Sequence, residues 1–368
     1  MSDIRCRLRR GPAVAALALA FAAAAAFTPL AASAAPVSTE FTVSGAVATP
    51  LTFDAAALQA LPAVTQTDTF LSGSTPQTHT YVGPTLWNVV GQAGVVANPA
   101  INNDVLNRIV VATGTDGYRV VYSMGELHPN FGNSAALAAY AEVIGGSAQP
   151  LAGDGFARTT APLDGRGGRY VSNLVGLEVQ RTASTSTAGG GGMSTQFTVS
   201  GDVLNPMTFD LAALQALSLP TVTRTFGSDT YSGVSLWELL TSVIGLDTDP
   251  AVKNDVLGMY VVATGSDGYQ IAFSLGELSP LFGNQPDFIA FELNGDDLTS
   301  SGFARVVVPN DVRRGRWVSN LVSLEVFHAA AAVPLPATAA LALAGLLLLP
   351  AARAFRPRAA PGRGARPR

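Results

Sequence analysis

The sequence predicts an α+β protein with mostly β content, in which one domain occurs twice. Short runs of alternating apolar and polar residues, such as residues 41–44, are typical of strands. A short helix is predicted over residues 55–61, where Asp54 is suited to be the N-cap and Pro62 ends the run. The middle of the 368-residue chain also repeats itself at a spacing of roughly 150 residues. This indicates a domain duplication, because solenoid repeats are only about 20–50 residues long.

The duplication rests on six pairs of closely matching segments that occur in the same order in both copies. The pairs are residues 41–45 with 197–201, 54–61 with 210–217, 103–106 with 254–257, 111–118 with 262–269, 155–158 with 302–305, and 171–175 with 318–322. Because the spacing within pairs drifts only slightly along the chain, small loop deletions account for the difference between the copies.

Further elements are expected at equivalent places in the two copies. Helices are predicted over residues 84–90 and 235–243, strands over residues 108–113 and 259–264, strands that follow an Asp-Gly turn over residues 118–122 and 269–273, and closing strands over residues 170–179 and 317–327.

Charge is unevenly distributed along the chain. The two ends hold ten of the 22 basic residues and one of the 26 acidic residues, which leaves 12 basic and 25 acidic side chains in the middle. Nucleic-acid binding needs clustered Lys and Arg, whereas the chain has a single lysine, Lys253. The acidic middle therefore excludes nucleic acid as a partner.

Cysteine use is equally limited, since Cys6 is the only one and lies in the segment that we expect to be removed. The mature chain then has no disulfide, no thiol nucleophile and no thiolate metal ligand.

Residues 1–35 are predicted to be a secretory signal peptide. Four arginines precede an apolar run over residues 13–27, and Ala32-Ser33-Ala34 supplies the small residues that a signal peptidase accepts. A retained membrane anchor is the alternative, and the export route, Sec or twin-arginine, stays open.

Residues 329–368 are predicted to be a second targeting segment. A short motif, Val333, Pro334, Leu335 and Pro336, is followed by an apolar run to Ala352 and then by six arginines. The run is expected to form a transmembrane helix with its arginine end in the cytoplasm. This order resembles a PEP-CTERM sorting signal, which implies an exosortase-type protease as partner and a membrane-anchored or cell-surface location. A plain C-terminal anchor is the alternative.

Between these ends the sequence predicts two domains and a linker. The first domain covers residues 36–181 and the second covers residues 196–328, while residues 182–195 form a Gly/Ser/Thr-rich linker. Such a linker is a flexible coil, so the two domains need not hold a fixed relation.

The order of motifs resembles the molybdopterin-binding domain of the sulfite oxidase type, most closely in the second copy. The matching segments are residues 205–209, 210–217, 231–237, 267–269, 274–278, 293–295 and 302–309. The resemblance implies two tandem mixed-sheet domains of the sulfite oxidase type and an oxidoreductase ancestry. In that family a cysteine thiolate holds molybdenum, but the corresponding stretches, residues 65–81 and 221–231, contain no cysteine. Because a softer metal needs thiolate or imidazole ligands and these stretches offer only His79, no bound metal or cofactor is expected. Molybdopterin bound without the metal bond stays an alternative.

Four residues are candidates for ligand binding, and none is predicted to be catalytic. The resemblance places Arg158 and Arg305 near the pterin phosphate, and a guanidinium suits an anion. A structural ion pair is the alternative for both. Asp116 and Asp267, each before Gly-Tyr, are candidate cleft carboxylates, although an Asp-Gly turn alone accounts for them.

Other polar and aromatic residues favour structural roles. We expect Trp87 and Trp237 in the core, Asp296-Asp297 in a solvated loop rather than a calcium site, and no metal at His79, His128 or His328, which do not repeat between the copies.

Three functions are consistent with these features. The favoured one is an exported cell-envelope protein whose duplicated, non-catalytic domains act as a binding or matrix module. The second is an extracytoplasmic molybdopterin-dependent oxidoreductase with an atypical metal site. The third is an unrelated fold that binds polysaccharide or ions.

Overall fold

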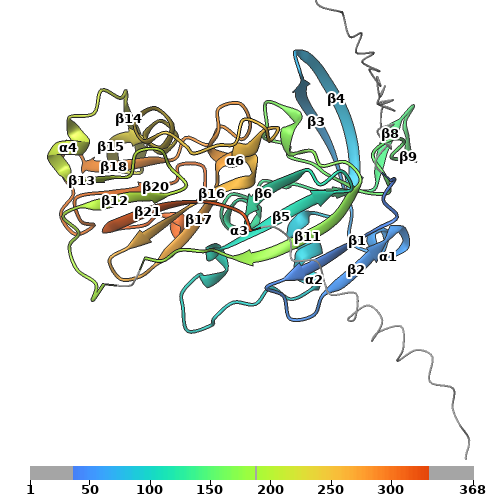
Figure 1. The fold of residues 1–368 in the computed structure, drawn as a ribbon, viewed down its shortest axis with the longest axis horizontal. Coiled ribbons are helices and arrows are strands. Elements are labelled where there is room, and N and C mark those ends of the chain that lie inside the picture. Colours follow the sequence, from blue (N-terminus) through green and yellow to red (C-terminus); the bar gives the residue numbers. More distant parts are fainter. Residues whose placement is uncertain (1–35, 187–188, 331–368) are drawn as a thin grey trace, which may run out of the picture. The chain divides into compact units, whose positions relative to one another are not determined.

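The structure is a computed structural model that describes residues 36–186 and 189–330 (Figure 1). The predicted signal peptide, the sorting motif at residues 333–336 and the predicted transmembrane helix lie outside these residues. Within the described ranges, no helix has both the length and the apolar character needed to span a membrane.

The first repeat is built on a five-stranded mixed sheet. Its strands, in spatial order, are β2 (Leu51–Asp54), β1 (Glu40–Gly45), β11 (Leu174–Arg181), β5 (Arg108–Gly114) and β6 (Arg119–Ser123). Strands β1 and β11 run parallel, and every other neighbouring pair is antiparallel. This parallel pair consists of the first and last strands of the repeat. The sheet is therefore complete only when both ends of the repeat are in place.

The second repeat has a five-stranded sheet with the same order. Its strands are β13 (Met207–Phe209), β12 (Phe197–Gly201), β21 (Leu321–His328), β16 (Met259–Gly265) and β17 (Gln270–Ser274). The parallel register also repeats, because Thr42 pairs with Gly176 and the equivalent Thr198 pairs with Ser323. The chain is thus a mixed α and β protein in which one topology occurs twice.

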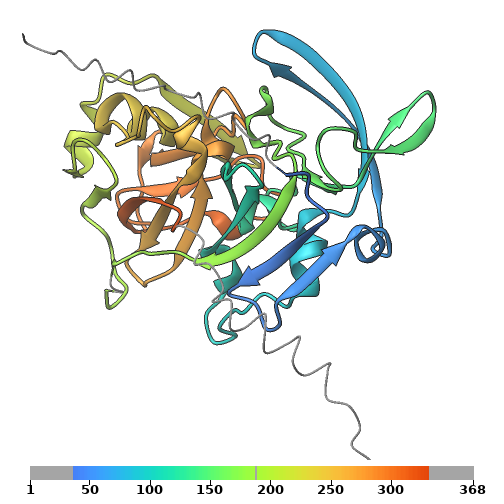
Figure 2. The same ribbon diagram turned by 45° about the vertical axis from the view of Figure 1, so that its right-hand side comes forward.

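A second sheet accompanies each of these five-stranded sheets. In the first repeat it contains β3 (Val64–Ser72), β4 (Thr75–Gly83), β8 (Ala141–Ile144) and β9 (Ser147–Pro150), and β7 (Ala138–Ala139) pairs separately with β10 (Arg158–Thr159). In the second repeat it contains β14 (Thr221–Phe226), β15 (Asp229–Ser235), β18 (Phe288–Leu293), β19 (Asp296–Asp297) and β20 (Arg305–Val307). Figure 2 shows the β3–β4 hairpin as a long curved ribbon (blue).

The helices of the described residues are short, and the predicted N-cap at Asp54 is present. Helix α1 (Ala55–Gln59) is capped by Asp54, and α4 (Leu211–Gln215) is capped by Asp210. The other helices are α2 (Leu86–Gln92), α3 (Met124–Leu127), α5 (Leu236–Glu238) and α6 (Leu275–Leu278).

Two predicted elements have different bounds in the structure. The helix expected over residues 235–243 is a short α-helix that continues as a π-helical segment, Leu239–Ile244. The closing strands begin at Leu174 and Leu321, four residues later than predicted. Asn173 and Asn320 have positive φ angles of 50° and 51°, so the backbone turns just before each strand begins.

Strands β5 and β16 are buried on both faces, which explains their near-continuous apolar sequences. One face of each strand packs in the core of its own repeat. The other faces meet in a third apolar cluster, formed by Ile109, Val111 and Val121 of the first repeat with Tyr260, Val262 and Ala272 of the second. The two repeats therefore share an apolar interface.

The predicted linker is held against the second repeat at its first residues. Ser184 and Thr185 donate hydrogen bonds to the Glu325 carboxylate, and the backbone N–H of Ala183 donates to the Tyr260 hydroxyl over 3.1 Å. Both repeats fall in one compact unit that begins at Pro36. The linker composition allows the repeats to move independently, but the linker contacts and the shared apolar interface restrain both repeats.

Candidate functional site

The predicted carboxylates Asp116 and Asp267 both stabilise the turns in which they lie. Each accepts a hydrogen bond of 3.0 Å on Oδ1 from the backbone N–H of the tyrosine two residues later. Both side chains are exposed. Among the described residues, neither forms a hydrogen bond or an ion pair with the arginine predicted for its own repeat. Asp267 nevertheless lines a cavity, described below, whereas Asp116 lines none of the principal cavities.

Arg158 lies in a group of carboxylates in the first repeat. It forms an ion pair with Asp154, four residues earlier. Its guanidinium lies over the rings of Tyr81 and Tyr170, at 5.3 and 5.5 Å from their centroids. Burial raises the pKa of Tyr81 to about 12, with Arg158 opposing this rise and three carboxylates, Glu142, Asp154 and Asp68, adding to it.

Arg305, the equivalent residue of the second repeat, has no carboxylate partner within the part of the chain that the structure describes. Its Nη1 donates a hydrogen bond to the Ser301 hydroxyl over 3.1 Å, and its buried Nε, like that of Arg158, has no acceptor among the described residues. The guanidinium lies over the rings of Tyr231 and Trp317, at 5.5 and 5.1 Å. Burial lowers the pKa of Arg305; Tyr231 opposes this effect, and the neighbouring Arg314 adds to it.

Arg314 is the second cation at this place. Its guanidinium lies 4.7 Å from the Trp317 ring centroid and 5.6 Å from that of Phe226. The three aromatic rings pack edge to face, with Phe226 and Tyr231 at 4.8 and 5.5 Å from Trp317. Neither arginine forms an ion pair within residues 36–186 and 189–330. We call Arg305, Arg314 and these three rings the arginine–aromatic site.

The two repeats differ in charge at four equivalent positions around the arginine, although the tyrosine beneath it is the same in both. Strand pairing aligns Tyr81 with Tyr231, Glu142 with Leu293 and Asp68 with Phe226. The repeat itself aligns Asp154 with Ser301 and Gly167 with Arg314. Every carboxylate around Arg158 is thus replaced by an uncharged residue around Arg305, and a second arginine is added. Arg158 is neutralised internally, whereas Arg305 and Arg314 are available to an anion.

A cavity of about 360 Å³ lies beside Arg314. Trp317 and Asp267 also line it, together with residues from both repeats and from the linker. Asn103 of the first repeat donates from Nδ2 to the Tyr269 hydroxyl of the second over 3.0 Å. The arginine–aromatic site therefore opens on a cavity that one repeat alone does not complete.

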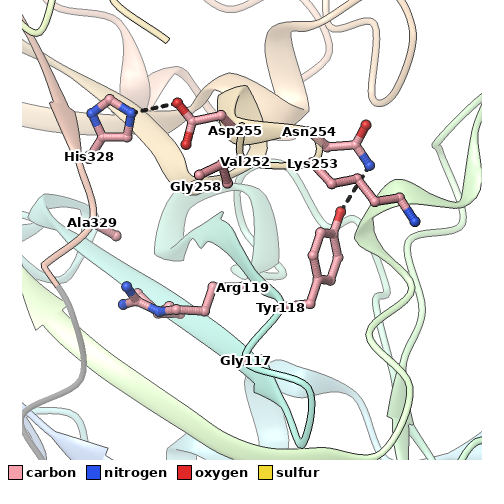
Figure 3. A pocket seen from close by; sticks show the side chains of 11 residues that line it. Gly117, Tyr118, Arg119, Val252, Lys253, Asn254, Asp255, Gly258, His328 and Ala329 are labelled. Atoms are coloured by element: carbon pink, nitrogen blue, oxygen red, sulfur yellow. Dashed lines mark hydrogen bonds and ion pairs between the residues drawn. The ribbon is translucent and has the colours of Figure 1, made fainter. Parts of the chain in front are cut away.

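A smaller cavity of about 190 Å³ lies at the end of β21 (Figure 3). It contains His328, whose Nδ1 lies 2.8 Å from Asp202 and whose Nε2 lies 3.0 Å from Asp255. The hydrogen bonds to both carboxylates raise the pKa of His328 against the opposing effect of burial, its largest single influence. These contacts fasten the last strand, and within the described ranges no three His, Cys, Asp or Glu side chains converge as a metal site.

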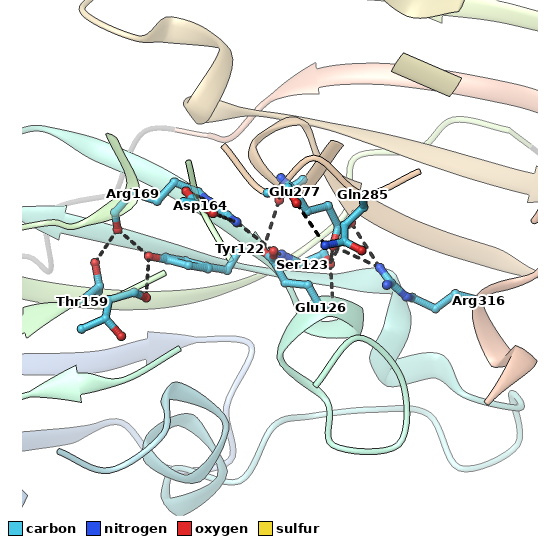
Figure 4. A network of polar contacts seen from close by, with 12 residues as sticks. Tyr122, Ser123, Glu126, Thr159, Asp164, Arg169, Glu277, Gln285 and Arg316 are labelled. Atoms are coloured by element: carbon cyan, nitrogen blue, oxygen red, sulfur yellow. Dashed lines mark hydrogen bonds and ion pairs between the residues drawn. The ribbon is translucent and has the colours of Figure 1, made fainter. Parts of the chain in front are cut away.

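Between the repeats lies a buried polar network (Figure 4). Arg169 pairs with Glu126 at 2.7 Å and with Asp164 at 2.6 Å, while the equivalent Arg316 pairs with Glu277 at 3.1 Å and with Asp311 at 2.6 Å. All of these charges are compensated by partners. Each of these ion pairs lies within one repeat, and hydrogen bonds from Ser123 to Glu277 and from Ser274 to Glu126 join the two halves of the network. The network therefore holds the two repeats together and is not a ligand site.

The residues present do not fit a molybdenum centre. The segments that the resemblance assigns to the metal ligand lie in the hairpins β3–β4 and β14–β15 and contain no thiolate. Their one imidazole, His79, is bonded to Glu142 through Nδ1 at 2.7 Å. Of the residues that the resemblance assigns to the cofactor, only Arg305 is suited to bind it, because its guanidinium can bind an anionic group.

Sequence reasoning found Arg305 but missed Arg314, Trp317 and Ser301. The missed signal is the difference between the repeats: Gly167 becomes Arg314 and Asp154 becomes Ser301 at otherwise matching places.

Comparisons with known proteins add little to this description. No family model matches the chain, and no curated protein matches it. Among solved structures, the chain is similar to the sulfane dehydrogenase SoxCD from Paracoccus pantotrophus, with 12% sequence identity over 76% of this chain and 77% of that chain and a TM-score of 0.32. At that TM-score the likeness carries no argument about function.

Proposed function

We propose that this chain is an exported cell-envelope protein whose second repeat binds an anionic ligand between Arg305 and Arg314, without redox catalysis. The observation that supports the proposal is the loss, around Arg305, of every carboxylate that surrounds Arg158. The Arg305 guanidinium is half-buried without a carboxylate partner among the described residues, which favours the binding of an anion. Two guanidiniums placed on one aromatic cluster suit a bidentate oxyanion.

The cell-envelope part of the proposal rests on the sequence. The signal-peptide pattern at residues 1–35 and the PEP-CTERM-like tail at residues 329–368 support export, anchoring through the C-terminal helix and handling by an exosortase-type protease. The proposal also takes both repeats as degenerate domains of the sulfite oxidase type, a fold used here for binding.

Anion binding is tested by exchanging one residue between the repeats. Titration calorimetry of the full-length chain with inorganic phosphate is expected to show binding that weakens with salt. Ser301→Asp places a carboxylate where Asp154 stands beside Arg158, and we expect it to reduce phosphate affinity by about tenfold or more. Asp154→Ser, the reverse exchange in the first repeat, is the matched control and leaves binding at Arg305 intact. A Ser301→Asp protein that binds phosphate like the parent, or a parent that binds none, contradicts the proposal.

The redox alternative is tested on protein purified after its own export. Molybdenum analysis and the fluorescence of oxidised pterin are expected to show neither group. A stoichiometric amount of either would establish a cofactor-dependent oxidoreductase instead. Export itself is checked by fractionating the host cells, where intact protein in the cytoplasm would contradict the assignment.

A further inference from the structure

The cavity beside Arg314 is lined by polar side chains, amides and one carboxylate, from three separate segments. Asn102 and Asn103 come from the loop before β5 of the first repeat, Asp267 from the β16–β17 turn and Asn320 from the loop before β21. Its volume of about 360 Å³ is within the range of small-ligand sites, about 300–1,000 Å³. The cavity therefore has room for more than a bare oxyanion.

These side chains keep hydrogen-bonding capacity in addition to the bonds that hold them. Asn103 uses its Nδ2 for the Tyr269 hydroxyl, so its Oδ1 is left as an acceptor. Asn320 accepts from the Ser194 N–H on Oδ1 over 3.2 Å, which leaves its amide N–H groups as donors. Asp267 uses Oδ1 for the Tyr269 N–H, and its Oδ2 has no partner among the described residues. The lining therefore offers a ligand both donors and acceptors.

This arrangement selects for a particular chemistry. A sugar hydroxyl both donates and accepts, so it suits a wall where amides and a carboxylate stand together. An anion alone is attracted by Arg314 but repelled by the Asp267 carboxylate on the same cavity wall. A ligand that suits both Arg314 and Asp267 must carry its negative charge at one end and hydroxyl groups at the other.

We infer that the cavity binds an acidic saccharide, with a sugar carboxylate at Arg314 and ring hydroxyls at Asp267, Asn102 and Asn103. This inference rests on the proposed anion site and names its ligand class. The equivalent place in the first repeat has a different set of groups, because Gly167 stands for Arg314 and the cationic Lys253 stands for the amide of Asn102. One saccharide site per chain follows, and it requires both repeats.

The test compares three probes on the full-length chain by titration calorimetry: D-glucuronate, D-glucose and acetate, with inorganic phosphate as the reference anion. Glucuronate is expected to bind about tenfold or more tightly than either glucose or acetate, since only glucuronate combines charge and hydroxyls. Asn102→Ala is expected to weaken glucuronate binding by about fivefold and leave phosphate binding unchanged. Asp267→Asn keeps the Oδ1 acceptor of the turn and is expected to weaken glucuronate binding but to strengthen phosphate binding. Lys253→Ala, at the position equivalent to Asn102, is the control and changes neither.

The outcomes separate the two proposals. If phosphate binds but glucuronate binds no more tightly than acetate, the saccharide inference is wrong and the anion site stands. If neither anion binds, the anion site is wrong and the inference falls with it. Equal weakening of glucuronate and phosphate by Asn102→Ala would show that this residue acts on the fold, and would also overturn the saccharide inference.

Discussion

Ser123 of the first repeat donates a hydrogen bond to Glu277 of the second over 3.3 Å, and the equivalent Ser274 donates to Glu126 over 3.1 Å. Each serine also caps the short helix that carries its own glutamate, since the backbone N–H of Glu126 bonds to Ser123 Oγ and that of Glu277 to Ser274 Oγ. Helices α3 and α6 with their N-cap serines therefore each donate one hydrogen bond to the other repeat and accept one from it. The duplicated domain is arranged as an internal pseudo-dimer, and its stability depends on close approach at this point.

We predict that Gly276→Ala destabilises the protein. A β carbon at Gly276 would lie 2.7 Å from Cδ of Arg169, whose guanidinium is held by two carboxylates and has no room to move. Overpacking of this kind costs about 1–3 kcal/mol. The free energy of unfolding is measured by denaturant titration. Gly91→Ala, in helix α2 with open space around the new methyl group, is the control and is expected to be neutral or slightly stabilising. Equal effects of the two changes would contradict the close approach.

Asp287 is predicted to make stability fall as the pH rises. It is 1% exposed, and neither carboxylate oxygen has a partner among the described residues. Burial raises the pKa of Asp287 from 3.8 to about 7, with Arg316 opposing this rise and Asp311 adding to it. The folded state therefore binds the proton more tightly than the unfolded chain, so stability is lost between about pH 4 and about pH 7.

Replacing Asp287 by Ala, the residue at the equivalent position 136, removes this dependence. Unfolding free energies at pH 4 and pH 8 are expected to show the variant gaining on the parent at the higher pH. The gain is on the order of 4 kcal/mol, because one pKa unit corresponds to about 1.4 kcal/mol. A gain that is the same at both pH values would show that the carboxylate does not titrate in this range.

The helix N-caps are expected to contribute equally in the two repeats. Asp54 accepts from the Ala57 N–H and Asp210 from the Ala213 N–H, both over 2.8 Å and both at the surface. Asp54→Ala and Asp210→Ala should each destabilise by about 1 kcal/mol. Asp→Asn at either position keeps the acceptor and serves as control. A much smaller effect at one position in thermal denaturation would show that its helix is held by packing alone.

The pKa values of His328 and His128 are predicted to lie on opposite sides of the usual histidine value of 6.5. Hydrogen bonds to Asp255 and Asp202 raise the pKa of His328, although burial opposes them as the largest single effect, while burial lowers the pKa of His128. Two-dimensional NMR of the histidine rings should place the midpoint of His328 above 6.5 and that of His128 below it.

For His328 the folded state favours the charged ring. Its contribution to stability is therefore complete below about pH 6.5 and is lost as the pH rises through its raised pKa. Asp202→Asn should move the His328 midpoint down and leave that of His128 in place. An unmoved His328 midpoint would contradict the ion pair at Asp202.

Several features were determined by local sequence. Asp54 and Asp210 cap their helices because an Asp side chain reaches a backbone N–H three residues on, and this needs no distant partner. The duplication is likewise visible in the matching segments, and the topology repeats strand for strand. The absence of a thiolate from residues 65–81 and 221–231 also needs no structure.

Tertiary structure decided which of the two arginines, Arg158 or Arg305, is paired with a carboxylate. Arg158 and Arg305 occur in closely similar local sequences, and the carboxylates that surround Arg158 include Asp68 and Glu142, which lie on strands β3 and β8. Whether a charge is neutralised depends on separations of a few ångströms, and chain topology, not sequence distance, sets those separations. The sequence alone determined two equivalent domains with an arginine each, and only the packing of strands from distant segments made one arginine a structural ion pair and left the other without a carboxylate.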